Sequence, residues 1–226
     1  MFKVAEKFVS INGESRRAGE LAVFIRFTGC NLSCSYCDTS WACPMDAPNT
    51  PMTTTEIVDY IKSTGIDNVT LTGGEPLLQP GIEDLIVDVI STNRRVEVET
   101  NGAVSIKSLY ELANKLNLTN ELSITLDYKC PRSGMMSFMI MENYDYLREY
   151  DTVKFVVGNR NDMDRAREVI AKTRLLDKNV AVYLSPIFGE IEPGEIVAYM
   201  IEHKMNGVTH QLQQHKIIWD PQRRGA

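Results

Sequence analysis

Short apolar runs alternate along the chain with longer segments whose apolar residues recur every three or four positions. The first pattern indicates buried strands, and the second indicates helices with one apolar face. Strands are therefore expected at 21–27, 68–71, 95–99, 121–127, 152–157 and 179–184, with a weaker alternation at 1–10 that could form an edge strand. Helices are expected near 53–61, 82–90, 106–116, 142–150, 162–174 and 193–204.

Local signals mark the ends and connections of several elements. Thr53 and Glu56 fit a capping box at the start of one helix, and Pro193 suits the first turn of another. The segment 42–51 contains three prolines without periodicity and indicates a surface loop, and a polar tail follows the last helix. The methionines of 135–141 are expected to fill gaps in the core.

The order of the elements determines the fold class. Parallel neighbours need a long connection, and the helices between the six stronger strands supply it through right-handed crossovers. We therefore expect an α/β fold, a curved and incomplete barrel of about six parallel strands. In such folds chemistry collects where the strands end. Unusual residues follow the strands at 30–37, 72–76 (Thr-Gly-Gly-Glu-Pro), 99–102 (Glu-Thr-Asn-Gly), 127–129 (Asp-Tyr-Lys) and 185–186 (Ser-Pro).

Composition narrows the class of protein. The 226 residues, 43% of them hydrophobic, suit one domain, 1–226, with its own core. A formal net charge of −6 argues against a broad surface for nucleic acid and favours a small substrate. No apolar run approaches the roughly 20 residues that cross a bilayer, and the N-terminus shows no secretory signal pattern. We therefore expect a cytoplasmic protein with no membrane partner.

Three cysteines, Cys30, Cys34 and Cys37, follow an apolar strand with the spacing C-x3-C-x2-C. Thiolates are soft ligands for zinc, copper(I) or iron–sulfur clusters, and a short loop can direct all three at one centre. Three thiolates on a four-iron cluster leave one iron open for a ligand. The alternative is a structural zinc with Cys43 or a histidine as its fourth ligand. The cysteines do not suit a disulfide framework, and Cys43 and Cys130 are expected to be ordinary thiols.

One charge interrupts the apolar strand just before these cysteines. A guanidinium among apolar neighbours must be paired or it destabilises the fold by several kcal/mol. The partner of Arg26 is either an internal carboxylate or a ligand anion. Its position beside the cysteine loop favours the ligand anion.

The combination of the cysteine motif with residues 72–76 resembles the radical S-adenosylmethionine (SAM) superfamily. In that superfamily the open iron chelates SAM, and the Gly-Gly-Glu-Pro turn holds its amino group. Over nearly the whole chain the sequence resembles one family, the 7-carboxy-7-deazaguanine synthases. Asn12 replaces the family's usual Gln, and Ser15 its usual Gly. The matching segments are 10–14 (Ser-Ile-Asn-Gly-Glu), Arg26, 37–39 (Cys-Asp-Thr), 214–219 (Gln-His-Lys-Ile-Ile-Trp) and 224–225 (Arg-Gly).

The resemblance implies a partial barrel of the radical SAM type and a lyase reaction. The reaction is the ring contraction of 6-carboxy-5,6,7,8-tetrahydropterin to 7-carboxy-7-deazaguanine with loss of ammonia, in queuosine and 7-deazapurine biosynthesis. One [4Fe-4S] cluster, SAM that is regenerated in each turnover, and Mg²⁺ bound through the substrate are implied as cofactors. The implied partners are the pterin, an electron donor such as flavodoxin or ferredoxin, and a second copy in a homodimer, without direct nucleic-acid contact.

The resemblance also implies roles by position. Cluster ligands are Cys30, Cys34 and Cys37, with Thr39 as a ligand of Mg²⁺. The pterin is bound by Ile11, Asn12, Gly13, Glu14, Arg26 and Thr72. SAM is bound by Gly74, Glu75, Asp127, Tyr128 and Lys129. Further candidates for ligand contacts are Glu99, Asn101, Ser185, Gln214 and His215.

Two other functions are open on the residues alone. A glycyl-radical activating enzyme shares both radical SAM motifs, but it consumes SAM and acts on a large partner protein. A non-enzymatic zinc or redox-binding module would use the cysteines alone. The reaction product separates the first alternative, and the brown colour of a four-iron cluster in anaerobically purified protein separates the second.

Overall fold

A mixed sheet of nine strands lies at the centre of the computed structural model, which describes residues 1–118 and 120–225. The strands are β1 (Phe2–Ile11), β2 (Leu21–Phe27), β3 (Thr50–Met52), β4 (Asn68–Gly73), β5 (Arg95–Thr100), β6 (Leu122–Tyr128), β7 (Thr152–Val157), β8 (Ala181–Pro186) and β9 (Val208–His210). The helices are α1 (Thr54–Thr64), α2 (Ile82–Ser91), α3 (Lys107–Lys115), α4 (Asn143–Tyr146), α5 (Arg160–Thr173), α6 (Pro193–Glu202) and α7 (Gln214–Ile218). Within these residues, no helix has the length and apolar character that a bilayer crossing requires.

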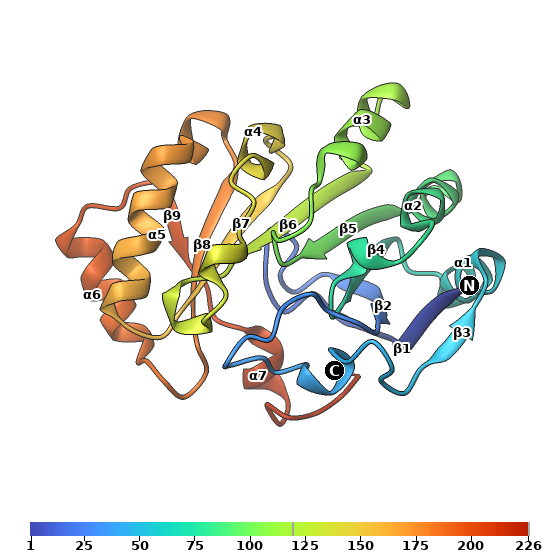
Figure 1. The fold of residues 1–226 in the computed structure, drawn as a ribbon, viewed down its shortest axis with the longest axis horizontal. Helices are drawn as coiled ribbons and strands as arrows, with labels where there is room; N and C mark the ends of the chain where they lie inside the picture. The colour runs from blue at the N-terminus through green and yellow to red at the C-terminus, as the bar shows by residue number, and fades with distance from the viewer. Residues whose placement is uncertain (119, 226) are drawn as a thin grey trace.

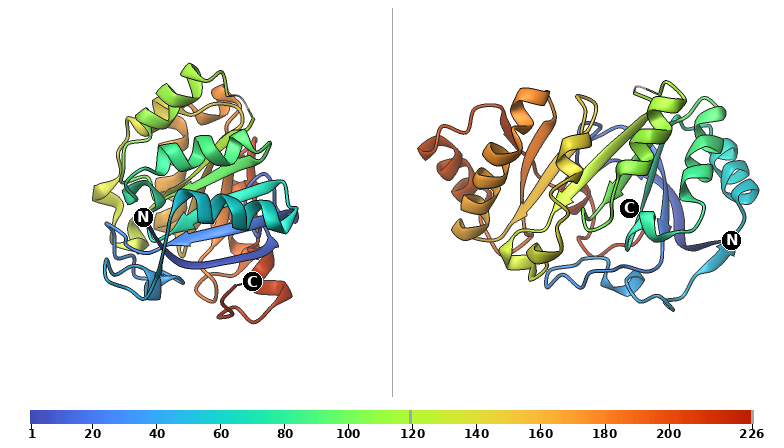
Figure 2. Two further views of the ribbon diagram at one scale, coloured as in Figure 1. Left: turned by 90° about the vertical axis from the view of Figure 1, so that its right-hand side faces the viewer. Right: turned by 45° about the horizontal axis from the view of Figure 1, so that its top comes forward.

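The strands lie in the order β3-β1-β2-β4-β5-β6-β7-β8-β9. From β2 to β9 the neighbours are parallel, whereas β1 runs antiparallel to both of its neighbours. Helices α1, α2, α3, α5 and α6 lie along the outer face of the curved sheet, and α7 lies on the other side, where it contacts the segment that follows β1 (Figure 1). Figure 2 shows the curvature of the sheet from two further sides. The arrangement confirms the predicted fold class, an incomplete α/β barrel.

The periodicity of the sequence does not predict the two short strands β3 and β9, nor the helix α7 in the C-terminal tail. β3 lies in the segment expected to be a surface loop, and it pairs with the start of β1, so that β3 and not β1 is the edge strand there. β9 adds a seventh parallel strand beside β8. Strands of three residues are too short to show an alternation. The helix expected near 142–150 is limited to α4, whereas the capping box of Thr53 and Glu56 is confirmed at α1.

Alternation along the central strands separates an apolar outer face from a polar inner face. On β4, Val69 and Leu71 belong to the core, and Thr70 and Thr72 point to the opposite face. The same alternation on β5, β6 and β7 puts charged residues on the inner face, among them Glu97, Glu99, Asp127 and Lys154. The inner face therefore carries the polar groups from which a ligand site can be built.

Residues 12–20 cross the inner face near the N-terminal ends of the parallel strands. At the start of β4, Arg17 Nη1 donates to Asn68 Oδ1 at 2.7 Å. Two residues further along β4, Thr70 Oγ1 donates to Asn12 Oδ1 at 2.8 Å. These bonds fix the segment against the sheet and place the following residues under the strand ends.

Ser15 explains why glycine is usual at this position in the family that the sequence resembles. Its φ of +68° lies in the left-handed region that favours glycine. Two hydrogen bonds offset the strain here, because the Ser15 amide donates to Gln211 Oε1 at 2.7 Å and the Ser15 hydroxyl forms a hydrogen bond with Thr125 Oγ1 at 3.0 Å. The substitution therefore preserves the path of the backbone.

The buried carboxyl of Glu97 is expected to make the free energy of unfolding depend on pH. It is 6% exposed on the inner face, and burial, reinforced by the charge of Glu99, raises its pKa to about 7. Because the folded pKa lies above the ordinary value near 4.5, the stability linked to its proton is present below about pH 4.5 and is lost as the pH rises through 7. A shift of this size corresponds to about 3 kcal/mol.

The variant Glu97→Gln is expected to remove this loss. Urea unfolding between pH 5 and pH 8 should show the variant gaining stability relative to the wild type as the pH rises, by up to about 3 kcal/mol. Thr125, which donates to Glu97 Oε1, can donate equally to the amide oxygen. Parallel pH profiles for the two proteins would contradict the expectation.

Candidate active site

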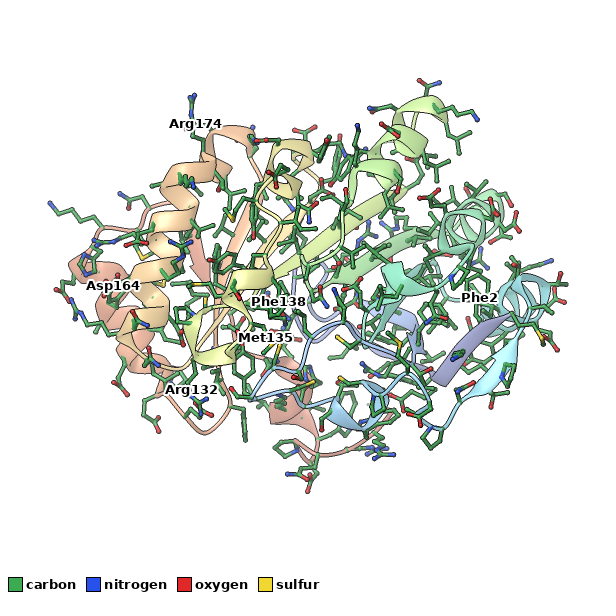
Figure 3. All side chains as sticks on the ribbon, in the orientation of Figure 1. Phe2, Arg132, Met135, Phe138, Asp164 and Arg174 are labelled. Carbon is green, nitrogen blue, oxygen red and sulfur yellow. The ribbon has the colours of Figure 1, made fainter. Side chains whose placement is uncertain are left out.

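The cysteine loop leaves the C-terminal end of β2 and is fixed from two sides. The backbone N–H of Cys30 donates to the carbonyl of Cys43 at 2.9 Å. From the segment after β6, Arg132 Nη1 donates to Ser35 Oγ at 2.9 Å, and Ser35 Oγ also donates to the Arg132 carbonyl at 2.7 Å. Arg132 and Met135, labelled in Figure 3, both come from this segment and lie beside the loop.

Four thiols gather in this part of the structure. Cys43, expected to be an ordinary thiol, has its Sγ 3.7 Å from Cys37 Sγ. The neighbouring Cys43 thiol lowers the pKa of Cys30 to about 6 and that of Cys37 to about 7. Burial instead raises the pKa of Cys34 to about 11. The Leu32 amide donates toward Cys30 Sγ at 3.4 Å, a bond of the kind that tunes sulfur ligands.

The thiols can be compared with the needs of a single zinc ion and of a multi-iron cluster. Zinc–sulfur bonds of about 2.3 Å bring tetrahedral thiolates to about 3.8 Å from one another, and the Cys37–Cys43 pair has that spacing. Among the described residues, however, no three His, Cys, Asp or Glu side chains form a group that could hold one metal ion. Cys30, Cys34 and Cys37 are free thiols, as the larger body of a cluster requires of its three ligands.

The turn after β4 lies directly against the cysteine loop. Gly73 has φ +147°, and a Cβ atom there would lie 2.3 Å from the carbonyl oxygen of Phe27. A Cβ atom on Gly74 would lie 2.2 Å from the carbonyl oxygen of Gly29 and 3.0 Å from Cys30 Cβ. The two glycines are therefore required for the close approach of the two backbones.

Glu75 is fully buried and connects this turn to the end of β5. Its carboxylate accepts from Thr100 Oγ1 at 3.0 Å and from the Asn101 amide at 2.7 Å, while burial raises its pKa to about 7. Asn101 Nδ2 in turn donates to Asn31 Oδ1 at 2.8 Å and toward Cys30 Sγ at 3.5 Å. Glu75 thus acts on the cysteine loop through Asn101, a residue that the sequence marks as a ligand candidate.

Two lysines and two carboxylates meet on the inner face, and we call Glu14, Asp127, Lys129 and Lys154 the lysine–carboxylate cluster. Lys129 Nζ lies 2.8 Å from Asp127 Oδ2. Lys154 Nζ lies 2.9 Å from Glu14 Oε2 and 3.8 Å from Asp127 Oδ2. The four side chains are 10–19% exposed. Although burial opposes both shifts, Lys154 lowers the pKa of Glu14, and the carboxylates of Glu14, Asp127 and Glu99 raise the pKa of Lys154.

Several buried polar atoms near this cluster have no partner among the described residues. An unbonded buried polar group destabilises a protein by roughly 1–3 kcal/mol, so such atoms mark places that a ligand can occupy. Each carboxylate of the cluster has one such oxygen, while its other oxygen is held by a lysine. The unpartnered atoms include Glu14 Oε1, Asp127 Oδ1, Asn12 Nδ2 and Ser185 Oγ.

Arg26 has a protein partner, which corrects the prediction that a ligand anion takes that place. Its Nε lies 2.8 Å from Oε1 of Glu6, which faces it on the antiparallel neighbour β1. Both side chains are 19% exposed. The ion pair uses Nε, and the two Nη groups of Arg26 have no hydrogen-bond partner among the described residues. Thr72 lies opposite Arg26 on the parallel neighbour β4, so both residues belong to this side of the site.

Tyr128, predicted together with Asp127 and Lys129 to bind SAM, has its side chain on the outer face of the sheet. Tyr128 lies between Asp127 and Lys129 in the sequence, and the alternation of β6 turns its ring to the outer face. There it packs on Phe155 with ring centroids 5.3 Å apart, and its hydroxyl accepts from Arg165 Nε at 2.9 Å. Its side chain therefore belongs to the core under the helices.

The C-terminal tail folds back over the site. Gln214 donates its amide N–H to the carbonyl of Gly13 at 3.0 Å. A Cβ atom on Gly13 would lie 2.0 Å from His215 Nδ1, so the glycine makes room for this ring. Lys216 Nζ forms an ion pair with Asp38 Oδ2 at 2.8 Å. The tail thus joins the N-terminal segment to the end of the cysteine loop.

Glu14 and Thr39, which both have predicted roles, lie where the tail meets the N-terminal segment and the cysteine loop. Ile11, which also has a predicted role, lies apart from them. Glu14 Oε2 accepts from Gln213 Nε2 at 3.2 Å. Thr39 Oγ1 donates to Asp38 Oδ1 at 3.1 Å, on the carboxylate that Lys216 holds. Ile11 instead lines a cavity of about 230 Å³ that the tail forms with β1 and β2.

The sequence analysis missed three residues of the site. Lys154 carried a usable signal, because it is a single charge in an apolar strand, as Arg26 is. Gln213 carried none, and Lys216 lies in the segment 214–219 that resembles the family but had no predicted role. Both reach their partners across most of the chain.

Comparison with known proteins identifies the family of the chain. Residues 24–129 match the family model of the radical SAM superfamily. A 7-carboxy-7-deazaguanine synthase of Clostridium acetobutylicum is 51% identical over 226 residues, which cover 100% of this chain and 99% of that protein. A 7-carboxy-7-deazaguanine synthase of Chlorobaculum tepidum is 33% identical, with 99% of this chain and 96% of that protein covered.

Solved structures agree on the fold. The crystal structure of QueE from Escherichia coli matches with a TM-score of 0.70 and 20% identity, over 93% of both chains. Streptococcus suis SuiB bound to S-adenosylmethionine matches with a TM-score of 0.58 and 14% identity, over 82% of this chain and 48% of that one. With the fold established by these structures and the relationship by the full-length relatives, the chain belongs to the 7-carboxy-7-deazaguanine synthase family of the radical SAM superfamily.

Proposed function

We propose that this chain catalyses the ring contraction of 6-carboxy-5,6,7,8-tetrahydropterin to 7-carboxy-7-deazaguanine with release of ammonia, as a radical SAM lyase of queuosine and 7-deazapurine biosynthesis. The observation that carries the proposal is 51% identity to a 7-carboxy-7-deazaguanine synthase over the full length. The geometry supports it, because free thiols, a close glycine turn and half-satisfied carboxylates lie together on one polar face.

Three thiols would hold the [4Fe-4S] cluster, those of Cys30, Cys34 and Cys37. When bound, the cluster supplies the electron that cleaves SAM and starts the radical reaction. The N–H groups of Leu32 and Asn101 donate toward Cys30 Sγ and would stabilise it as a thiolate. Both groups are fixed by the fold, so the ligand is oriented before metal arrives.

SAM would lie between the glycine turn and the lysine–carboxylate cluster. Gly74 keeps the turn free of side-chain bulk next to the cysteine loop. Asp127 keeps Oδ1 free to accept from an amino or hydroxyl group, and Lys129 holds the other oxygen at 2.8 Å, which fixes the direction of the carboxylate. The unpartnered hydroxyl of Ser185 would add a contact to the same ligand.

The pterin would lie on the side of the N-terminal segment. Glu14 Oε1 is free to accept from pterin N–H groups, and Asn12 Nδ2 is free to donate to a pterin oxygen or nitrogen. The two Nη groups of Arg26 can donate a pair of parallel hydrogen bonds to the substrate carboxylate while Nε stays on Glu6. Thr72 lies beside that arginine.

The proposal includes further partners. Thr39 would give one hydroxyl to Mg²⁺, with substrate oxygens and waters completing the shell. We also propose one domain over 1–226, a homodimer, a cytoplasmic location, and a flavodoxin or ferredoxin as reductant. A glycyl-radical activating enzyme and a zinc module are not favoured, because the full-length relatives are 7-carboxy-7-deazaguanine synthases.

An anaerobic assay of reconstituted protein with 6-carboxy-5,6,7,8-tetrahydropterin, SAM and dithionite tests the function. Because SAM is regenerated in this reaction, the product 7-carboxy-7-deazaguanine is expected to exceed released 5′-deoxyadenosine several-fold. Protein that has not been reconstituted serves as the control and should give neither. Formation of 5′-deoxyadenosine without the deazapurine, or in a one-to-one ratio to it, would contradict the proposal.

A further inference from the structure

Lys154 contacts both carboxylates of the lysine–carboxylate cluster. It comes from β7 and places Nζ 2.9 Å from Glu14 Oε2 and 3.8 Å from Asp127 Oδ2. Glu14 belongs to the segment that crosses the inner face, whereas Asp127 lies near the end of β6. One cation therefore links two parts of the site that are far apart in the sequence.

The two carboxylates are each half satisfied. The oxygens that face lysine are bonded, and the other two, Glu14 Oε1 and Asp127 Oδ1, are buried without a partner among the described residues. Lys154 is 12% exposed, so water screens its interactions little. A donor that reaches either free oxygen must change how strongly that carboxylate attracts the shared lysine.

We propose that Lys154 is a positioning residue that couples the binding of two ligands, one at Asp127 and the other at Glu14. The inference rests on the proposed function, in which Asp127 faces SAM and Glu14 faces the pterin. Lys154 touches neither ligand in this arrangement. It acts through the two carboxylates that do.

The coupling is positive. A donor group of SAM on Asp127 Oδ1 offsets part of the carboxylate charge, which leaves Lys154 more firmly on Glu14. Glu14 is then held in one rotamer with Oε1 directed at the second ligand. The binding of that ligand therefore no longer includes the entropy cost of ordering the Glu14 side chain. Because coupling between two binding sites is reciprocal, the pterin strengthens SAM binding by the same factor.

The lysine can be replaced without leaving either carboxylate alone. Asp127 keeps its 2.8 Å ion pair with Lys129, and Glu14 keeps its hydrogen bond from Gln213. Methionine retains most of the unbranched apolar stem of lysine and removes the charge. Lys154→Met therefore removes the shared cation and leaves each half of the site with a partner.

The test measures the dissociation constant of SAM on reconstituted protein, anaerobically, with and without saturating 6-carboxypterin. This oxidised analogue has no hydrogen on C6 to abstract, so binding is measured without turnover. In the wild type, SAM is expected to bind at least about fivefold more tightly with the analogue present. In Lys154→Met the ratio is expected to fall to about one, and Lys154→Arg is expected to restore part of it.

Lys178→Met is the matched control, because Lys178 is a partly buried lysine outside the site that donates to the Tyr144 carbonyl at 2.8 Å. It is expected to keep the wild-type ratio. A wild-type ratio in Lys154→Met, at unchanged iron content and melting temperature, would overturn the inference, as would a ratio of one in the wild type itself.

Two further outcomes are distinguishable. If Lys154→Met does not fold, Glu14→Gln breaks the same link from the other side and must also lower the ratio for the inference to stand. If the wild type neither binds 6-carboxypterin nor converts the tetrahydropterin, the proposed function fails, and this inference fails with it.

Discussion

Protein carrying Cys34→Ala is expected to retain almost no iron or sulfide after anaerobic reconstitution, against about four of each in the wild type. The motif supplies one thiolate to each of three irons, and the two thiolates that remain in the variant cannot hold the cluster. Iron and sulfide analysis of the desalted protein measures the result.

Two other cysteines serve as controls for this loss. Cys130 is fully buried in the core, and Cys130→Ala is expected to leave iron content unchanged. Cys43→Ala is the more demanding control, because Cys43 Sγ lies 3.7 Å from Cys37 Sγ. It is also expected to keep its iron. A loss in Cys43→Ala as large as in Cys34→Ala would favour a site of four cysteines over the three-thiolate cluster.

Gly74→Ala is expected to lower the free energy of unfolding by roughly 3 kcal/mol and to reduce iron content. The new Cβ would lie 2.2 Å from the carbonyl oxygen of Gly29, so the turn after β4 and the cysteine loop must separate. Backbone atoms on both sides leave no flexible side chain to move aside. Urea unfolding and iron analysis on the same preparation measure both effects.

Gly194→Ala tests whether the effect comes from contact and not from loss of a glycine. Gly194 lies in the first turn of α6, and an added Cβ would meet no atom within 4 Å. The change is expected to be neutral or stabilising, within about 1 kcal/mol. Equal melting temperatures and iron contents for Gly74→Ala and the wild type would mean that the two loops are not held as closely as the structure has them.

Signals that the chain carries locally could be predicted. The capping box of Thr53 and Glu56, the proline at the start of α6, and the strand–helix rhythm each depend on residues within a few positions of one another, and the structure confirms them. The approach of the cysteine loop to the glycine turn followed from the fold, because both segments leave the same ends of parallel strands.

What could not be predicted depends on partners that are distant in the sequence. Glu6 is paired with Arg26 by the antiparallel register of β1 and β2, which no pattern in the chain specifies. The outward direction of the Tyr128 side chain has a simpler cause. Strand alternation puts neighbouring residues on opposite faces, so if Asp127 faces the site, its neighbour cannot do so.

The contact between the tail and the N-terminal segment also determines when the site can form during synthesis. Ser15 bonds to Gln211, and Glu14 bonds to Gln213, so the inner face waits for residues made almost 200 positions later. At ribosomal rates of roughly 5–20 residues per second, that interval is about 10–40 s. The cysteine loop has its contacts with the segment after β6 well before the tail emerges, but Asp38 at its end waits for Lys216 of the tail. Throughout that interval the nascent chain carries its three thiols on a loop whose last residue, Asp38, still lacks the lysine that holds it.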